Sequence, residues 1–246
     1  MLPIRDLNPS RRTPIFTFMI VAACILIYLA VQTGEEHFYA AASIPCEITT
    51  GEPLSSAEIF QGAPCTAGDV PVHPDKNIWF SVVASIFFHG SIGHLISNLW
   101  VLFIFGNNVE DAFGHLPYLA FYLLAGLVAS GAHILLQPLS TLPVVGASGA
   151  IAGVMGAYAV LFPRARVTSI IPPFFFWPFA LPAMVFLGIW FLSQFLLAGG
   201  ESNIAWEAHV AGFGFGVLVA AIARKRLRAH STATVGQYPI GRRVYR

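Results

Sequence analysis

Gln137-Pro138-Leu139-Ser140-Thr141-Leu142-Pro143 is the only polar, proline-bearing break inside a long run of sequence that has no Asp, Glu, Lys or Arg. The run extends from Asp111 to Arg164. A helix needs ~20 apolar residues to cross a bilayer, and it must satisfy its own backbone hydrogen bonds there. The run is long enough for two such helices, so the chain must turn back within it, and the prolines favour a turn at 137–143. This stretch therefore predicts a pair of membrane helices, at 116–136 and 144–162.

Uncharged runs on both sides of this pair predict four more membrane helices, at 13–33, 91–109, 181–198 and 204–223. Of the 246 residues, 56% are hydrophobic and 10% are charged, whereas soluble domains have about 25% charged residues. This composition argues against a soluble globular protein, and also against a disordered one. We therefore predict an all-α membrane protein with a bundle of six transmembrane helices. The segment 167–180, rich in Pro, Phe and Trp, is expected to lie at the membrane interface.

Basic residues predict the orientation of this bundle. The chain has 13 Lys and Arg residues, and with a cytoplasmic N-terminus all of them except Lys76 lie on the cytoplasmic side. This asymmetry favours cytoplasmic N- and C-termini. The predicted organisation is an N-terminal tail at 1–12, a six-helix domain at 13–223 with a long outer loop at 34–90, and a basic tail at 224–246. We interpret the basic tail as an orientation signal near anionic lipid and not as a nucleic-acid site.

Two of the three cysteines lie in the predicted outer loop. Cys46 and Cys65 are on that side, whereas Cys24 falls within the first predicted span. An outer compartment that is oxidising would allow a disulfide between the two outer cysteines, and two unpaired thiols are the alternative.

Polar residues inside predicted membrane spans are costly and therefore indicate function. His94 and Asn98 are four residues apart and share one helix face. Ser148 and His209 come from two further spans. All three spans run from the outside inward, and Ser148 and His209 are each expected about five residues, or roughly 7 Å, below the start of their helix. These side chains should therefore meet in one layer near the outer face.

Small residues predict a close contact between the helices that carry this serine and this histidine. Gly149 and Gly153 are four residues apart in one span, and Gly212 and Gly216 are four residues apart in the other. Small residues at this spacing let two helix backbones approach closely. Such a contact would bring the serine within reach of the histidine.

A serine hydroxyl becomes a useful nucleophile when a neighbouring base takes its proton, and histidine suits that task near neutral pH. We interpret Ser148 as the nucleophile and His209 as the base. The Asn98 amide, a His94 nitrogen and the backbone N–H of Ser148 could stabilise the oxyanion of amide cleavage. No acidic third member is obvious, so the sequence predicts a Ser–His dyad that needs no cofactor.

Metal binding is the rival use of His89, His94 and His209. Zinc would need three or four converging nitrogen, sulfur or carboxylate ligands. No carboxylate lies near His94 at its depth in the predicted span, so we predict no metal site.

The sequence resembles the rhomboid intramembrane serine proteases over about residues 13–223. Three motifs carry the resemblance in this order: His94-x-x-x-Asn98, Gly146-x-Ser148-Gly149 and Ala208-His209-x-x-Gly212. The resemblance implies that Ser148 is the nucleophile and His209 the general base. It assigns His94 and Asn98 to the oxyanion, with Gly146 and Gly149 in support of the serine.

Three further residues gain an interpretation from the resemblance. His89 matches a second histidine of the family, which helps to structure a hydrated cavity. Glu110 resembles a structural acid at the inner end of the span 91–109. Asp111 beside it is expected to be solvated.

Two positions depart from the pattern of many family members. Trp79-Phe80 stands where those members have a Trp-Arg pair, so the anchoring of the outer loop is expected to differ. Ala152 stands where they have an aromatic residue stacked against the histidine. Some other group must therefore orient His209.

The resemblance implies that the substrates are transmembrane segments of other membrane proteins, cleaved near the outer face. Entry is expected past the span 181–198, which contains Pro182 and Gly188. A helical amide is shielded by its own hydrogen bonds, so small or helix-weakening substrate residues should favour cleavage. The expected partners are such substrates and membrane lipids, and the bare six-span core suits a bacterial cytoplasmic membrane.

Two other functions compete with this hypothesis. A catalytically silent rhomboid-like protein would bind membrane clients without cleaving them, and the departure at Ala152 gives this alternative its weight. A small transporter or channel would use the intramembrane histidines and Asn98 as a relay, and it would not need the Ser148 hydroxyl.

Overall fold

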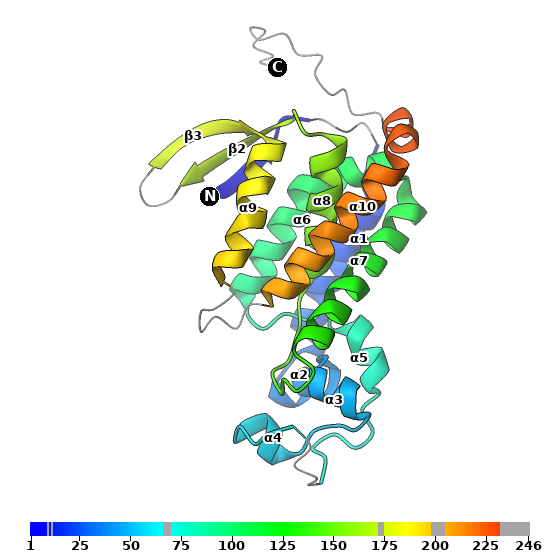
Figure 1. Ribbon diagram of the computed structural model, residues 1–246, viewed down its shortest axis with the longest axis vertical. Helices are drawn as coiled ribbons and strands as arrows, with labels where there is room; N and C mark the ends of the chain where they lie inside the picture. Colours follow the sequence, from blue (N-terminus) through cyan, green and yellow to red (C-terminus); the bar gives the residue numbers. More distant parts are fainter. Residues whose placement is uncertain (9, 11, 66–69, 172–174, 198–204, 232–246) are drawn as a thin grey trace, which may run out of the picture.

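A bundle of helices dominates the computed structural model, which describes residues 1–8, 10, 12–65, 70–171, 175–197 and 205–231 (Figure 1). The bundle helices are Ile15–Leu26 (α1, continued by the π-helical turn η1 at Ile27–Val31), Ile92–Phe113 (α6), His115–Leu136 (α7), Ser148–Leu161 (α8), Ala183–Leu197 (α9) and Trp206–His230 (α10). Each of them lies at one of the predicted spans. By length and composition, α6, α7 and α10 are long and apolar enough to cross a membrane. Of the predicted basic tail 224–246, the first residues extend α10, and 232–246 lie outside the described residues.

α8 lies at the centre of this bundle, with α6, α7, α9 and α10 packed around it (Figure 1). Its residues are buried from Gly149 to Tyr158. A Cβ at Gly212 would overlap the carbonyl group of Gly149, and a Cβ at Gly216 would overlap that of Gly153. The same α8 glycines also pack against alanines of α7. The predicted glycine contact between α8 and α10 is confirmed, and it holds the two backbones in direct contact.

Short helices fold into a separate module within the predicted outer loop, at the lower end of the bundle in Figure 1. They are Glu35–Ala41 (α2), Pro45–Thr50 (α3), Ser56–Phe60 (α4) and Ile78–Ala84 (α5). We call the described residues between 35 and 84 the outer module. Cys46 and Cys65 form a disulfide within it, with their Cα atoms 5.9 Å apart. Of the two alternatives for these cysteines, the structure has the bridge.

Lys76, the basic residue of the predicted outer loop, is buried in this module. Its ammonium group lies 2.5 Å from the carboxylate of Glu47, and the two side chains are 1% and 2% exposed. Lys76 also donates a hydrogen bond to the carbonyl of Tyr39 in α2. Burial lowers the pKa of Lys76, and the neighbouring Glu47 carboxylate opposes that shift. The ion pair therefore joins α2 and α3 to the chain that leads into α5.

A small antiparallel sheet lies beside the bundle, so the predicted all-α fold is wrong in this part of the chain. The described strands are Leu2–Asp6 (β1), Arg166–Ile171 (β2) and Phe175–Pro182 (β3), in the order β1-β2-β3. β2 and β3 occupy the predicted interface segment. β-Branched residues such as Val167, Thr168 and Ile170 favour a strand. Pairing with β1 and β3 also gives β2 the backbone hydrogen bonds that it would otherwise lack.

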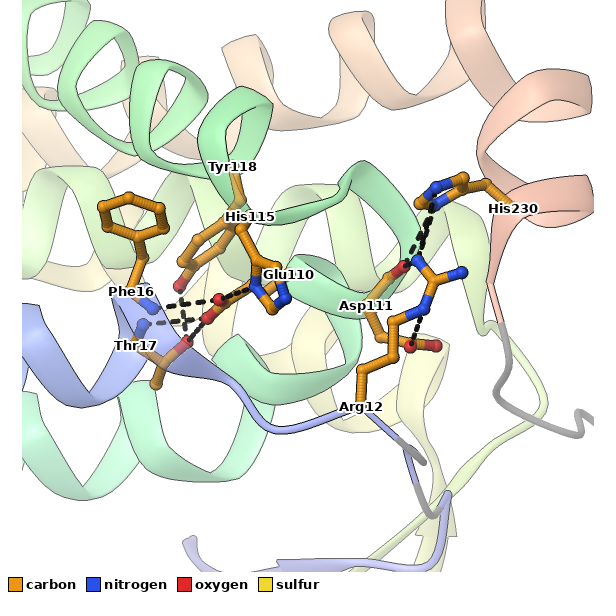
Figure 2. A network of polar contacts seen from close by, with 8 residues as sticks. All are labelled: Arg12, Phe16, Thr17, Glu110, Asp111, His115, Tyr118 and His230. Carbon is orange, nitrogen blue, oxygen red and sulfur yellow. Dashed lines mark hydrogen bonds and ion pairs between the residues drawn. The ribbon is translucent and has the colours of Figure 1, made fainter.

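Glu110 fastens the start of α1 to the C-terminal end of α6 (Figure 2). Its carboxylate accepts hydrogen bonds from the backbone N–H groups of Phe16 (2.9 Å) and Thr17 (2.8 Å), and from the Thr17 hydroxyl (2.7 Å). His115 Nδ1 lies 2.6 Å from the same carboxylate. The first N–H groups of a helix lack partners inside the helix, and Glu110 supplies them. Its geometry is that of a structural acid.

Asp111 lies beside Glu110 but faces a different set of partners. It is 2% exposed, so the expectation that it is solvated is wrong. Arg12 Nε lies 3.7 Å from Asp111 Oδ1, and the Arg12 guanidinium also contacts the ring of His230 (Figure 2). The reason is that the end of α6 is enclosed by the N-terminal segment and by the end of α10.

Candidate active site

Ser148, the first residue of α8, contacts His209 near the start of α10. Its Oγ lies 2.8 Å from His209 Nε2, which is hydrogen-bond distance. Both side chains line a cavity of about 1130 Å³. The glycine contact between α8 and α10 sets this distance, because Gly212 lies one turn after His209 and touches the backbone of Gly149.

The start of α8 differs from the prediction. Ala147 is the N-cap of α8 and Gly146 before it has φ +125°, so Ser148 begins its helix and does not lie about five residues inside it. Val144 pairs with Ser43 of the outer module in an isolated β-bridge, and the Gly146 N–H donates to the carbonyl of Ser85. Both contacts hold the segment away from a helical path. The N–H groups at a helix start have no acceptor within the helix, and they carry partial positive charge next to Ser148.

His94 and Asn98 lie close to the residues before Ser148 because Gly146 has no side chain to displace them. Gly146 has φ +125°, a conformation that L side chains rarely adopt. A Cβ at Gly146 would lie 2.7 Å from His94 Cε1 and 3.6 Å from Asn98 Nδ2. Among the described residues, Asn98 Nδ2 has no hydrogen-bond partner. The two α6 side chains therefore present donors beside the segment that leads into the serine.

His89 stands behind His94 and does not line the cavity wall. It is fully buried, and its ring meets the His94 ring edge-on with centroids 5.2 Å apart. Gln32 holds its backbone on both sides, since Gln32 accepts from the His89 N–H and donates to the His89 carbonyl. His89 therefore supports the ring of His94. The described residues contain no group of three or more His, Cys, Asp or Glu that could hold a metal ion.

α9 contributes two residues that the sequence analysis did not identify. Gln194 Oε1 lies 2.8 Å from His209 Nδ1. The Trp190 ring lies 5.9 Å from the His209 ring, at an interplanar angle of 41°. Trp190 and Gln194 are four residues apart and therefore share one helix face. A glutamine on the same face as a tryptophan within an apolar span is the sequence signal that could have identified them.

Glu207, two residues before His209, ties the start of α10 to the end of α7. Its carboxylate accepts a hydrogen bond from Gln137 Nε2 at 3.0 Å and lies 3.3 Å from His133 Nδ1. Gln137 belongs to the turn that the sequence analysis places between two spans. This contact closes the same end of the bundle that holds the serine and the histidine.

Comparisons with known proteins match most of this bundle. A family model described as the Rhomboid domain matches residues 76–226, which is more than half of the chain. The chain is 33% identical over 166 residues to RHOMBOID-like protein 12, mitochondrial, of Arabidopsis thaliana, a match that covers 60% of this chain and 46% of that protein. It is 28% identical over 149 residues to Rhomboid protein 1, mitochondrial, of Saccharomyces cerevisiae, covering 56% and 40%.

A bacterial relative matches over a shorter stretch. The chain is 38% identical over 79 residues to Rhomboid protease GluP of Bacillus subtilis, covering 32% of this chain and 15% of that protein. The matched region thus spans less than half the length of each of these three relatives. Because two of them are named as mitochondrial, the expected bacterial cytoplasmic membrane lacks support from the comparisons.

Proposed function

The chain belongs to the rhomboid family and is a multi-pass membrane protein, and from this premise we propose that it is an intramembrane serine endopeptidase with a Ser148–His209 dyad. One observation carries the proposal: the 2.8 Å contact between Ser148 Oγ and His209 Nε2. A serine hydroxyl hydrogen-bonded to an imidazole is the arrangement that activates a serine nucleophile. One relative is named as a rhomboid protease, and this name supports the same proposal.

The reaction starts when Ser148 Oγ attacks the carbonyl carbon of the scissile amide and His209 Nε2 takes the hydroxyl proton. The tetrahedral intermediate collapses, His209 gives that proton to the departing amide nitrogen, and an acyl-enzyme remains on Ser148. A water molecule, deprotonated by the same imidazole, then attacks the acyl carbonyl. The second tetrahedral intermediate expels Ser148 Oγ, which takes the proton back from His209 as the acid product leaves. The cavity next to the dyad provides room for this water.

We propose three donors for the oxyanion of the intermediate. The first is the backbone N–H of Ser148 at the start of α8, and the others are Asn98 Nδ2 and the His94 ring. Asn98 supports this role because its amide nitrogen is without a partner among the described residues. Removal of one such donor typically costs about 3 kcal/mol of transition-state stabilisation.

The proposed substrates are transmembrane segments of other membrane proteins, and the proposed partners also include lipid. A segment must unwind locally before its amide can reach Ser148, so small or helix-weakening residues near the cleaved bond should favour the reaction. Lateral entry past α9 is part of this proposal, because α9 forms one wall of the cavity through Trp190.

We further propose that all six bundle helices cross the membrane, with both termini on the cytoplasmic side and the outer module opposite. α8 has 14 residues, short for a span, but the non-helical residues 144–147 before it add length at the end where Ser148 lies. The one basic residue of the predicted outer loop, Lys76, is paired with Glu47, so it does not oppose this orientation as an exposed charge would.

A purified-protein assay with a model transmembrane substrate tests the proposal. Wild type should cleave the substrate, whereas Ser148→Ala and His209→Ala should not. Ser56→Ala and His37→Ala are matched controls, because both residues are exposed in the outer module and neither lines the cavity. A fluorophosphonate probe should label wild type and both controls but not Ser148→Ala.

The outcomes distinguish the competing functions. A wild type that is neither labelled nor active, although it binds transmembrane segments, would establish the silent rhomboid-like alternative. Cleavage by Ser148→Ala at the wild-type rate would contradict the assignment of the nucleophile.

A further inference from the structure

A histidine that acts as a general base must present an unprotonated nitrogen to its serine. The other ring nitrogen then carries the proton, and the partner of that nitrogen fixes which tautomer forms. In the proposed dyad Nε2 faces Ser148, so the question is what holds Nδ1. Within α8, Ala152 has no side chain able to do so. Among the described residues, a side chain of α9 contacts Nδ1.

The orientation of the Gln194 amide is determined by its own surroundings. Its Nε2 lies 3.1 Å from the Trp190 carbonyl oxygen and 3.3 Å from Ser193 Oγ. A flipped amide would place Oε1 against the Trp190 carbonyl oxygen, with two acceptors facing each other and no proton between them. The amide oxygen therefore faces His209, where Oε1 lies 2.8 Å from Nδ1.

This orientation fixes the protons along the chain of contacts. An amide oxygen only accepts, so His209 Nδ1 carries the hydrogen and donates it to Gln194. The neutral ring then has a lone pair on Nε2, and the Ser148 hydroxyl donates to that lone pair. Gln194 is 4% exposed, so little solvent competes with its hydrogen bond.

Trp190 packs against the same ring at a tilt of 41°. Its ring lies 5.9 Å from that of His209 and also packs against Phe213, one turn further along α10. The titratable groups that act electrostatically on His209 among the described residues are His94 and Glu207, and Glu207 is bound by His133 and Gln137.

We propose that Gln194 is a positioning residue that sets the tautomer of His209, with Trp190 fixing the ring plane, so that α9 completes the dyad. This inference rests on the proposed function and extends it. α9 is also the helix past which substrates would enter. A displacement of α9 that admits a substrate would withdraw the Nδ1 acceptor, and the base becomes competent again when α9 returns to His209.

The test compares two substitutions at position 194 with one on the opposite face of α9. Gln194→Met keeps the length of the side chain but removes the acceptor, whereas Gln194→Glu keeps an acceptor. Leu192→Met is the control, because Leu192 is 65% exposed. Gln194→Met should lower kcat by roughly 10²-fold, the lower end of what a positioned base contributes, with little change in KM. Gln194→Glu should retain most of the activity and move the acid limb of the pH–rate profile upward, because a carboxylate favours imidazolium.

A second measurement reads the tautomer without relying on activity. Nitrogen-15 NMR of the labelled histidines should show the proton on His209 Nδ1 in wild type and in Leu192→Met, and a mixture of tautomers in Gln194→Met. Wild-type kcat in Gln194→Met, or an unchanged tautomer, would overturn the inference. The inference would also be overturned if Gln194→Met and Gln194→Glu lost kcat to the same extent and melting temperature to the same extent. If the wild type proved inactive, the proposed function would fail while the NMR result still decided the role of Gln194.

Discussion

At the scale of single residues, Gly146 shows how a missing side chain can determine a site. We expect Gly146→Ala to lower kcat by roughly 10²- to 10³-fold, because the methyl group would displace the His94 ring and strain a backbone at φ +125°. Substrate KM should change little. The measurement is steady-state cleavage of the model substrate beside a thermal melt.

Gly131→Ala is the control for this experiment. A Cβ at Gly131 in α7 meets nothing within 4 Å, and alanine is the better helix former. This variant should keep wild-type kcat. Equal activity of Gly146→Ala and Gly131→Ala would show that the position of His94 does not matter for the reaction.

Asp6 gives a residue-scale prediction on pH. Its carboxylate accepts hydrogen bonds from Asn108 Nδ2 at 2.7 Å and from the Tyr158 hydroxyl at 2.8 Å. Burial raises the pKa of Asp6 to about 6, although the Tyr158 hydrogen bond opposes the shift. The folded pKa exceeds the ordinary value of 3.8, so the folded state favours the protonated acid. Its contribution to stability is present at pH 4 and is lost as the pH rises towards 6 and above.

We therefore expect the melting temperature of wild type to fall from pH 4.5 to pH 7 by an increment that Asp6→Asn lacks. Asparagine can accept the same two hydrogen bonds without carrying a charge, so this variant should be at least as stable as wild type at pH 7. Asp75→Asn, at an exposed position, is the control and should melt as wild type does. A pH slope that survives in Asp6→Asn would assign the effect to another group.

The residues of the site could be identified from the sequence to different degrees. Ser148, His209, His94 and Asn98 stand out because each is polar within an apolar span. Gln194 is equally polar, but its role depends on how α9 is rotated about its axis, and no spacing along the chain fixes that rotation. The structure reveals this rotation, because the Trp190 ring of α9 lies against the His209 ring of α10.

At the scale of elements, uncharged runs predicted the bundle helices well but predicted the start of α8 poorly and missed the sheet. α8 starts at Ser148 because Val144 and Gly146 form hydrogen bonds with the outer module and with Ser85, and hydropathy carries no information on such contacts. The sheet was missed for a related reason. β2 is apolar enough to resemble an interface segment, and its strand partner β1 lies more than 150 residues away in the sequence.

The α9 helix carries the element-scale prediction. If α9 is the gate, a covalent bridge between introduced cysteines in the Ser148-proximal halves of α6 and α9 should abolish cleavage of transmembrane substrates. The same bridge should leave fluorophosphonate labelling of Ser148 intact, because it holds Gln194 against His209 and the probe does not need the lateral path. Reagents of increasing span should restore cleavage step by step, and the reduced, unbridged variant is the control. Full cleavage with the shortest bridge would exclude α9 as the gate.

At the scale of the whole molecule, the outer module depends on a buried ion pair as well as on its disulfide. Glu47→Gln would leave the Lys76 ammonium buried without a counter-charge, which typically costs about 3–5 kcal/mol. Hydrogen exchange should therefore speed up across α2 to α5 while the bundle stays protected. Since burial already lowers the pKa of Lys76 and the variant removes the opposing carboxylate, the loss should diminish as the pH rises towards 10.

Two further variants complete that experiment. Glu47→Gln combined with Lys76→Met removes both charges and should recover much of the protection. Glu52→Gln, at an exposed position of the same module, should exchange as wild type does. Equal protection in Glu47→Gln and Glu52→Gln would mean that the ion pair does not stabilise the module.

The proposed orientation is a property of the whole chain, because it follows from basic residues that are distant in sequence. Ser56→Cys places a thiol in the outer module, and Leu7→Cys places one on the exposed N-terminal segment. The native Cys24 is buried and the other two cysteines are bridged, so each variant offers one accessible thiol. In sealed cells, a membrane-impermeant maleimide should label Ser56→Cys directly and Leu7→Cys only after permeabilisation. The opposite labelling pattern would mean that the protein has the reverse orientation in the membrane. Labelling of both positions before permeabilisation would exclude an arrangement in which the outer module and the N-terminus lie on opposite sides.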